Sequence, residues 1–289
     1  MEYLIHLAIF ISIYAILALS LNLVVGYTGL LSVAQAGFYG LGAYTTAILM
    51  TKLGVNFFLA MIAGMILAAF IALLIGFVLS KFKGDYYALG SLGFTVIIWS
   101  VFLNWQELTR GPLGIPGIPR PPELLGFDFS NNGSFLILSL VFLVLVFYAS
   151  RFIVNSSFGR ALKAIREDEK AIQIFGYNAH HFKLLIFVIG AAFAALAGSL
   201  FASYITFIDP STFVFGESVF ILSIIILGGL ASLRGAVLGA VFLVLLPEIL
   251  RFLDFPPDIA AQMRQVVYGL LLILLMLYRP QGLVGEYRL

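Results

Sequence analysis

Residues 3–25 read YLIHLAIFISIYAILALSLNLVV, and no Asp, Glu, Lys or Arg interrupts them. A helix needs about 20 apolar residues to cross the roughly 30 Å hydrocarbon core of a bilayer, so this stretch is long enough to span one. The sequence therefore predicts an all-α, polytopic integral membrane bundle of about nine transmembrane helices, within a range of eight to ten. The other eight apolar runs lie near residues 30–50, 56–80, 86–104, 134–150, 184–207, 214–230, 235–250 and 262–278.

The composition excludes a water-soluble globular protein. Of the 289 residues, 62% are hydrophobic and only 10% are charged, whereas a soluble domain carries roughly 25% charged residues. The 16 Lys and Arg residues are scattered along the chain, which argues against a nucleic-acid-binding face. Cysteine is absent, so disulfides and thiolate metal sites are excluded. We expect one transmembrane domain over residues 1–289, whose first apolar segment is retained.

The basic residues predict the orientation in the membrane. If nine spans alternate, one set of loops holds eleven Lys and Arg residues and the other holds five. Cytoplasmic loops are enriched in Lys and Arg, so we expect a multi-pass protein of the cell (inner) membrane with its N-terminus outside and its C-terminus in the cytoplasm. The larger set is Lys81, Lys83, Arg151, Arg160, Lys163, Arg166, Lys170, Lys183, Arg234, Arg279 and Arg288, and the smaller is Lys52, Arg110, Arg120, Arg251 and Arg264.

Two of the loops are long. The external loop, residues 105–133, contains GPLGIPGIPRPP, in which Pro and Gly oppose a regular helix. It is either a plain connection or a rigid docking surface. The cytoplasmic loop, residues 151–183, contains SSFGRALKAIREDEKAIQIFG at 156–176, which is typical of an amphipathic helix with Ser157 as its N-cap and Gly176 at its end. Its mixed charges favour a protein partner, and the alternative is a surface helix that only joins two spans.

The stretch from Asn22 to Gly42 contains five glycines and several polar residues, so a continuous helix is not expected there. Interrupted helices are tolerated at membrane depth where protein or a water-filled cavity satisfies the backbone. We therefore predict broken helices and a translocation path, with a Gly-rich packing face as the alternative. GLLS at 29–32 and GLAS at 229–232 hint at an internal, inverted repeat. The candidate path residues are Asn22, Thr28, Ser32, Gln35 and Gly37.

Catalytic motifs are missing from the sequence. It contains no nucleotide-binding G-x-x-x-x-G-K-[ST], no H-E-x-x-H and no G-x-S-x-G, so we predict no catalytic residue, no bound metal and no enzyme. Glu217 and Glu248 lie in or near spans, where ionisable groups are often functional, but both fall close to predicted outer ends. A self-sufficient channel or secondary carrier is one alternative. An intramembrane enzyme that uses Glu217, Glu248 or His6 is another, although these residues share no motif.

Four motifs in order resemble the LivM-type permease subunits of high-affinity branched-chain amino acid ABC importers, a family that includes permeases for urea and short amides. The resemblance covers nearly the whole chain. RPQGLVG at 279–285 supports it. The four motifs are GYTGLLSVAQAGFYGLGAY at 26–44, KGDYYALGSLGF at 83–94, GPLGIPGIP at 111–119 and SSFGRALKAIREDEKAIQIFG at 156–176.

The resemblance implies a transport subunit that moves Leu, Ile or Val by ATP-driven alternating access and binds no cofactor itself, since ATP and Mg²⁺ belong to partner ATPases. It implies four kinds of partner: a homologous second permease, two cytoplasmic ABC ATPase subunits, a periplasmic or lipid-anchored solute-binding protein and the lipid bilayer, with no nucleic acid. The cytoplasmic loop would be the coupling helix that docks on an ATPase. Its implied residues are Arg160, Lys163, Arg166, Glu169, Ala171 and Gly176, although Lys170 departs from the usual E-A-A pattern.

Overall fold

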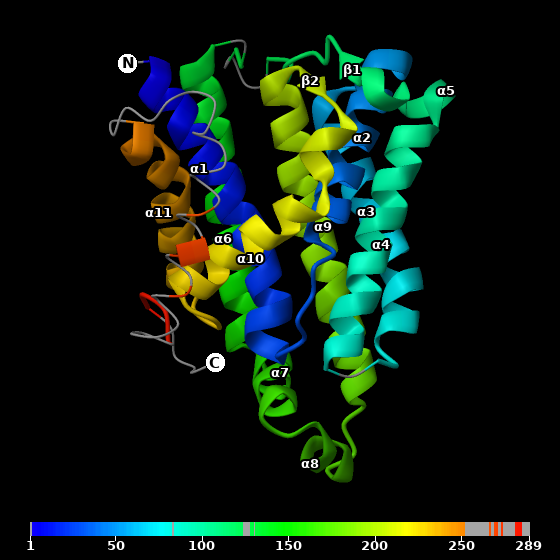
Figure 1. Ribbon diagram of the computed structural model, residues 1–289, viewed down its shortest axis with the longest axis vertical. Helices are drawn as coiled ribbons and strands as arrows, with labels where there is room; N and C mark the ends of the chain where they lie inside the picture. The colour runs from blue at the N-terminus through cyan, green and yellow to red at the C-terminus, as the bar shows by residue number, and fades with distance from the viewer. Residues whose placement is uncertain are drawn as a thin grey trace.

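The computed structural model describes residues 2–82, 84–123, 128–129, 131–251, 266, 269–270, 273 and 281–284. These residues form a bundle of long helices that run between two ends (Figure 1). Among them, five helices are long and apolar enough to cross a membrane. These are α1 (Glu2–Leu21) continued by the π-helix η1 (Asn22–Gly26), α3 (Phe57–Leu79), α4 (Asp85–Asn104), α6 (Asn132–Asn155) and α9 (Ala179–Ile205).

The count of nine spans is not confirmed, because three predicted runs differ from simple crossings. The run at 30–50 becomes α2 (Gln35–Leu53), which starts only after a non-helical segment. The runs at 214–230 and 235–250 become α10 (Phe215–Gly228) and α11 (Leu233–Arg251), which are bent by 119° and count together as one broken or re-entrant span. The run at 262–278 lies largely outside the described residues.

The upper end of the bundle in Figure 1 carries short elements that the all-α prediction missed. The external loop forms α5 (Gln106–Thr109), η2 (Gly111–Leu113) and the strand β1 (Ile115–Pro116). This strand pairs antiparallel with β2 (Phe207–Ile208), which follows α9 and precedes η3 (Pro210–Phe213). A Cβ at Gly114 would lie 2.4 Å from the Ile208 carbonyl oxygen, so a glycine is needed where the two segments meet.

The lower end carries a projecting hairpin of two helices, α7 (Ser157–Glu167) and α8 (Glu169–Ile174) (Figure 1). The prediction of one helix with Ser157 as N-cap was wrong. Ser156 is the N-cap, since its Oγ accepts from the Gly159 N–H at 3.3 Å. Asp168 then breaks the helix and caps α8, because its carboxylate accepts from the backbone N–H groups of Lys170 and Ala171. The predicted end at Gly176 is confirmed by its φ of 85°.

The centre of the bundle is held by close contact between α2 and α9. A Cβ on Gly42 would lie 2.0 Å from the Ala195 carbonyl oxygen, and one on Gly198 would lie 2.0 Å from the Tyr39 carbonyl oxygen. Small residues let helix backbones approach where lipid supplies no hydrophobic drive. The Thr46 hydroxyl also donates to Ser199 Oγ across this contact at 2.7 Å.

Members of the two predicted sets of basic residues lie at different places in the bundle. Arg151, Lys163 and Arg234 line one pocket between α6, α7 and α11. Lys52 belongs to the smaller set, and its Nζ donates to the Glu107 carbonyl oxygen beside α5 at 2.6 Å. These members of the two sets are therefore separated in the fold, as the predicted topology requires.

Candidate functional site

The helix interruption predicted between Asn22 and Gly42 is present, and it begins with the π-helix η1. Asn22 is fully buried. Its Nδ2 donates to the Ser232 carbonyl oxygen at 2.9 Å, and its Oδ1 accepts from the Ala231 N–H at 3.0 Å. These two backbone groups belong to the bend between α10 and α11. One polar side chain therefore satisfies the backbone of a second helix break some 210 residues along the chain.

The two similar four-residue segments, GLLS at 29–32 and GLAS at 229–232, both lie at helix breaks. Gly29 has a φ of 72° and Gly229 a φ of 112°, conformations that favour glycine. The breaks also touch, because a Cβ on Gly26 would lie 2.7 Å from the Ala231 backbone nitrogen. Leu283 and Val284 donate their N–H groups to the carbonyl oxygens of the last residues of α10 at 2.9 and 3.0 Å. The segments near Gly26, Ala231 and Leu283, which are distant in sequence, thus meet around the two helix breaks.

Residues 29–34 are non-helical, and α4 supplies hydrogen bonds to this segment. Ser91 Oγ accepts from the Val33 N–H at 3.0 Å, and the Thr95 hydroxyl donates to the Val33 carbonyl oxygen at 2.8 Å. Sequence reasoning missed both residues. The sequence contained a signal for them, because Ser91 and Thr95 are four residues apart and therefore place two hydroxyl groups on one face of an apolar helix.

The five candidate path residues are all buried, and the hydrogen bonds of their side chains join them to other residues and not to one another. The Thr28 hydroxyl donates to the Val24 carbonyl oxygen, Ser32 Oγ accepts from the Ala34 N–H, and Gln35 Nε2 donates to Ser20 Oγ. Gly37 packs on the Phe94 ring, to which an added Cβ would come within 3.1 Å. In this conformation the candidate residues hold the break together, and their contact with a transported solute stays a prediction.

The hairpin contacts the same break through α7. Arg166 Nη1 donates to the Gly26 carbonyl oxygen at the end of η1, and its Cγ would lie 3.2 Å from a Cβ on Gly29. One turn earlier, Lys163 Nζ lies 5.7 Å from the centre of the Tyr27 ring. Two of the six residues implied for the coupling helix therefore reach the interrupted helix directly.

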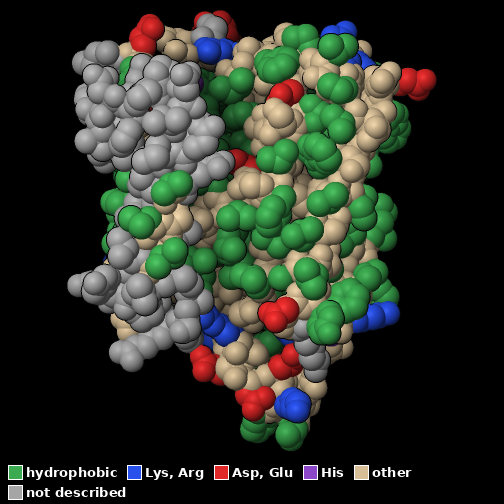
Figure 2. Space-filling view, in the orientation of Figure 1, with side chains coloured by type: hydrophobic (Ala, Val, Ile, Leu, Met, Phe, Trp, Pro, Cys, Tyr) green, Lys and Arg blue, Asp and Glu red, His purple; other side chains and the backbone are tan. Residues whose placement is uncertain are grey.

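The other coupling-helix residues lie further from the bundle. Arg160 Nη1 donates to the Asn155 carbonyl oxygen at 3.4 Å, and Glu169 forms a 2.8 Å ion pair with Lys183 at the start of α9. Ala171 is partly exposed on α8, and Gly176 ends the hairpin. Two side chains that the prediction did not single out for docking, Ile174 and Phe175, are 85% and 78% exposed. They form the apolar tip of α8, and Figure 2 shows hydrophobic side chains at this lowest point of the molecule.

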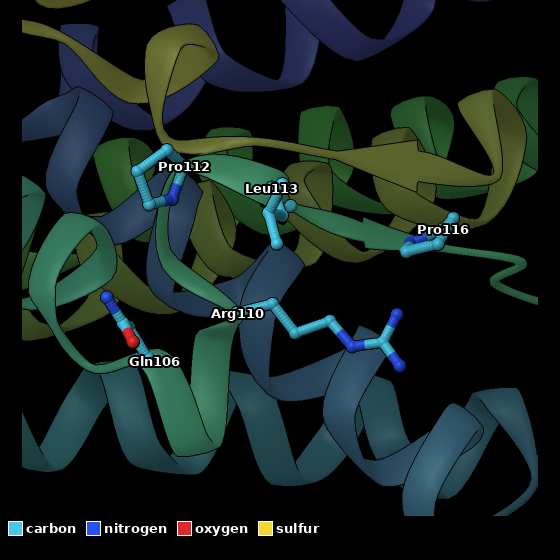
Figure 3. Close-up of a pocket in the computed structure, with 6 residues that line it drawn as sticks. Gln106, Arg110, Pro112, Leu113 and Pro116 are labelled. Atoms are coloured by element: carbon cyan, nitrogen blue, oxygen red, sulfur yellow. The ribbon is translucent and has the colours of Figure 1, made fainter.

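The external loop lines an open pocket of about 640 Å³ at the opposite end. Figure 3 shows Arg110 extended beneath Leu113, with Gln106 on the α5 side and Pro116 on the β1 side. Leu113 is 81% exposed, so the pocket presents an apolar centre with polar edges. The prolines and the β1–β2 pairing fix its backbone, as expected for a rigid loop.

Glu217 lies elsewhere than the sequence suggested. The Tyr14 hydroxyl donates to Glu217 Oε1 at 2.7 Å. Tyr14 is midway along the span Glu2–Gly26, so the carboxylate lies deep in the bundle instead of at an outer end. The sequence pattern could not reveal this depth, because the bent pair α10–α11 starts well inside the bundle (Figure 1). Among the described residues, no group of His, Cys, Asp or Glu could hold a metal ion.

Comparison with known proteins gives consistent matches. Residues 3–276 match the family model described as a branched-chain amino acid transport system permease component. The chain is 38% identical to the LivM permease protein of the high-affinity branched-chain amino acid transport system of Escherichia coli K12, over 96% of this chain and 68% of that protein. It is 31% identical to BraD of Pseudomonas aeruginosa over 95% of this chain and 92% of that protein. It is 27% identical to LivH of Escherichia coli K12 over the same shares. No solved structure matches.

Proposed function

Because this chain belongs to the family of branched-chain amino acid transport system permease components, we propose that it is a membrane-spanning subunit of an ABC importer for leucine, isoleucine and valine. It is a multi-pass membrane protein of a transport family. The proposed place is the inner membrane, with the N-terminus outside and the α7–α8 hairpin in the cytoplasm, because members of the larger basic set lie at the hairpin end.

The observation that carries the mechanism is the hairpin itself. Its tip exposes Ile174 and Phe175, an apolar pair that projects beyond the bundle and has no partner within the described chain. Exposed apolar groups of this kind mark interaction sites. Its base holds the Gly26 carbonyl oxygen through Arg166. A subunit that binds the tip can therefore displace the interrupted helix, as an ATPase would on closing around ATP.

The proposed assembly contains a second permease, two cytoplasmic ATPases and a solute-binding protein. The similarity to both LivM and LivH proteins supports a pair of homologous permeases. ATP and Mg²⁺ would bind to the ATPases, and this chain would bind no cofactor. The solute-binding protein would dock on the external loop, whose pocket combines the exposed Leu113 with Arg110.

Transport would proceed by alternating access. The binding protein delivers a zwitterionic amino acid to the outer face. Closure of the ATPases around ATP then moves the hairpin of each permease. A path between the two permeases opens first outward and then inward. No covalent chemistry takes place in this chain. The contacts between η1 and the α10–α11 bend make the two breaks move as one unit, because Asn22 joins them.

The test is uptake of radiolabelled leucine into proteoliposomes that contain the whole complex, with ATP and the solute-binding protein supplied. We expect uptake that needs ATP, both permeases and the binding protein, and that excess isoleucine or valine suppresses. If only urea or acetamide suppressed the leucine uptake, and isoleucine and valine did not, the complex would transport a different class of solute. Leucine uptake by the purified chain without ATPases would establish a self-sufficient carrier and refute the proposal.

A further inference from the structure

A carboxylate lies inside the bundle and has no cationic partner among the residues that the structure describes. Glu217 is in the first turn of α10, and its Oε1 accepts from the Tyr14 hydroxyl at 2.7 Å. Within the described part of the chain, it forms no ion pair and no other side-chain hydrogen bond. Glu217 is only partly buried.

A structural role alone accounts poorly for this carboxylate. An acidic residue in the first turn of a helix interacts favourably with the helix dipole, but a neutral serine or asparagine at the N-cap would satisfy the free N–H groups there without placing a charge in the bundle. Ionisable side chains inside membrane proteins are costly, and they usually pair with another charge or mark a substrate path. Glu217 accepts from one neutral donor and keeps a second carboxylate oxygen for another. Its partial exposure leaves that oxygen within reach of a ligand.

A line of aromatic side chains leads to Glu217 from the upper end. His6, Phe10 and Tyr14 follow at four-residue intervals and therefore share one face of α1. The centres of the His6 and Phe10 rings are 4.8 Å apart, and those of Phe10 and Tyr14 are 6.4 Å apart. At the upper end His6 Nδ1 lies 2.6 Å from the Tyr204 hydroxyl. The Phe220 ring meets Tyr14 edge to face at 5.3 Å beside the carboxylate.

The same helix offers apolar contacts beside the carboxylate. Phe220 follows Glu217 by three residues on α10, so it shares the same helix face, and it is partly exposed. An ammonium group is bound well by a carboxylate and by nearby aromatic faces. A compact apolar side chain is bound well by Phe surfaces. The site thus combines the two properties needed by a small apolar molecule with one amino group.

We infer that Glu217 is a substrate-binding residue of the translocation path, and that its carboxylate accepts a hydrogen bond from the α-ammonium group of the amino acid. This inference rests on the proposed function for the identity of the solute. Tyr14 is a positioning residue that holds the carboxylate toward the path. Phe220, together with Phe10 on α1, provides the apolar surroundings for the side chain.

The test is binding of radiolabelled leucine to the reconstituted complex, without ATP and without the solute-binding protein. We expect wild-type binding to be displaced by 3-methylbutylamine, which keeps the amino group, and not by 4-methylpentanoate, which lacks it. Glu217→Gln should weaken leucine binding roughly tenfold or more, because a charge-assisted hydrogen bond is lost. Glu217→Asp should keep more affinity than Gln, and Glu107→Gln, at an exposed carboxylate on α5, should leave binding unchanged.

Three results would overturn the inference. Displacement by the carboxylate instead of the amine, equal affinity in the wild type and Glu217→Gln, or weaker binding by Glu217→Asp than by Glu217→Gln would each do so. If Glu217→Gln failed to assemble, Tyr14→Phe would take its place, since it removes one hydroxyl and should weaken binding by a smaller factor. ATP-driven uptake is measured separately in the same vesicles. Absence of uptake with normal leucine binding would refute the proposed function and not this inference.

Discussion

The Asn22 side chain is fully buried and has both of its polar atoms hydrogen-bonded, whereas Phe175 is 78% exposed at the tip of the hairpin. Asn22 lies in a helix interruption that lipid cannot solvate, so the protein itself satisfies the backbone there. Phe175 directly follows α8, a helix of six residues of which none is buried. The polar groups of the interrupted region are hydrogen-bonded within this chain, whereas the apolar side chains at the hairpin tip would be buried only by a partner.

Replacement of Asn22 should have the largest effect on the interrupted region. Asn22→Ala leaves the buried Ala231 N–H without its partner and removes one hydrogen bond from the Ser232 carbonyl oxygen, which keeps the one from the Ala236 N–H. At about 1–3 kcal/mol for the unsatisfied N–H and about 0.5–1.5 kcal/mol for the lost hydrogen bond, the free energy of unfolding should fall by about 1.5–4.5 kcal/mol. Thermal unfolding in detergent, followed by size-exclusion chromatography, measures the loss. Asn104→Ala is the matched control, because Asn104 is exposed and its side chain caps only its own helix. Equal stability of the two variants would contradict the assignment.

Enlarging a glycine at the α2–α9 contact should have the next largest effect. Gly198→Ala places a methyl group against the Tyr39 carbonyl oxygen. Overpacking of this kind costs about 1–3 kcal/mol. Gly93→Ala, in α4, is the control, since nothing lies within 4 Å of its added Cβ and alanine favours a helix. Thermal unfolding should separate the two variants, and a fall in stability for Gly93→Ala as large as that for Gly198→Ala would be inconsistent with the packing described.

Changes at the hairpin tip should leave the bundle folded and weaken assembly. Phe175→Ser removes a side chain that contacts little within the chain, so unfolding should be nearly unchanged. Retention of the ATPase subunits during affinity purification should fall several-fold, because apolar area is lost from the interface. Leu113→Ser, equally exposed at the opposite end, should retain the ATPases. The docking assignment fails if Phe175→Ser purifies with a full complement of ATPases.

The smallest effect is expected at the ion pair that ties α8 to α9. Glu169→Gln removes the charge opposite Lys183, which is almost buried. Because Glu169 is itself partly exposed, the pair should contribute only about 1 kcal/mol or less to stability. ATP hydrolysis stimulated by the loaded binding protein should fall modestly in proteoliposomes and recover in Glu169→Asp. A complete loss of stimulation would mean that this pair, and not the tip, carries the docking contact.

The sequence predicted the features that depend on local composition. The apolar run at 3–25 became a span, and the glycines between Asn22 and Gly42 marked an interruption that the structure contains. The end of the hairpin at Gly176 was also predictable, because only a glycine readily takes that conformation. Such features require no knowledge of which segments meet in space.

Features that depend on contacts between distant segments were not predictable. Nothing in the pattern at 214–250 shows that its two halves bend by 119°, since each half is apolar and of ordinary helical composition. The partner of Asn22 lies 209 residues away at Ala231. For the same reason Glu217 seemed to lie near the surface of the membrane, whereas its hydrogen bond with Tyr14 places it deep in the bundle. The break of the hairpin at Asp168 was missed because its neighbours are good helix formers.

Arg166 is the residue that hydrogen-bonds the hairpin to the carbonyl oxygen of Gly26 in the interrupted helix, so its replacement tests the central claim. Arg166→Gln removes the charge while it keeps a polar side chain on α7. In proteoliposomes with the complete assembly, we predict normal content of ATPase subunits and basal ATP hydrolysis, with ATP-dependent leucine uptake reduced at least roughly tenfold. Uptake equal to that of the wild type, at equal ATPase content, would contradict the claim that the hairpin moves the interrupted helix through this residue.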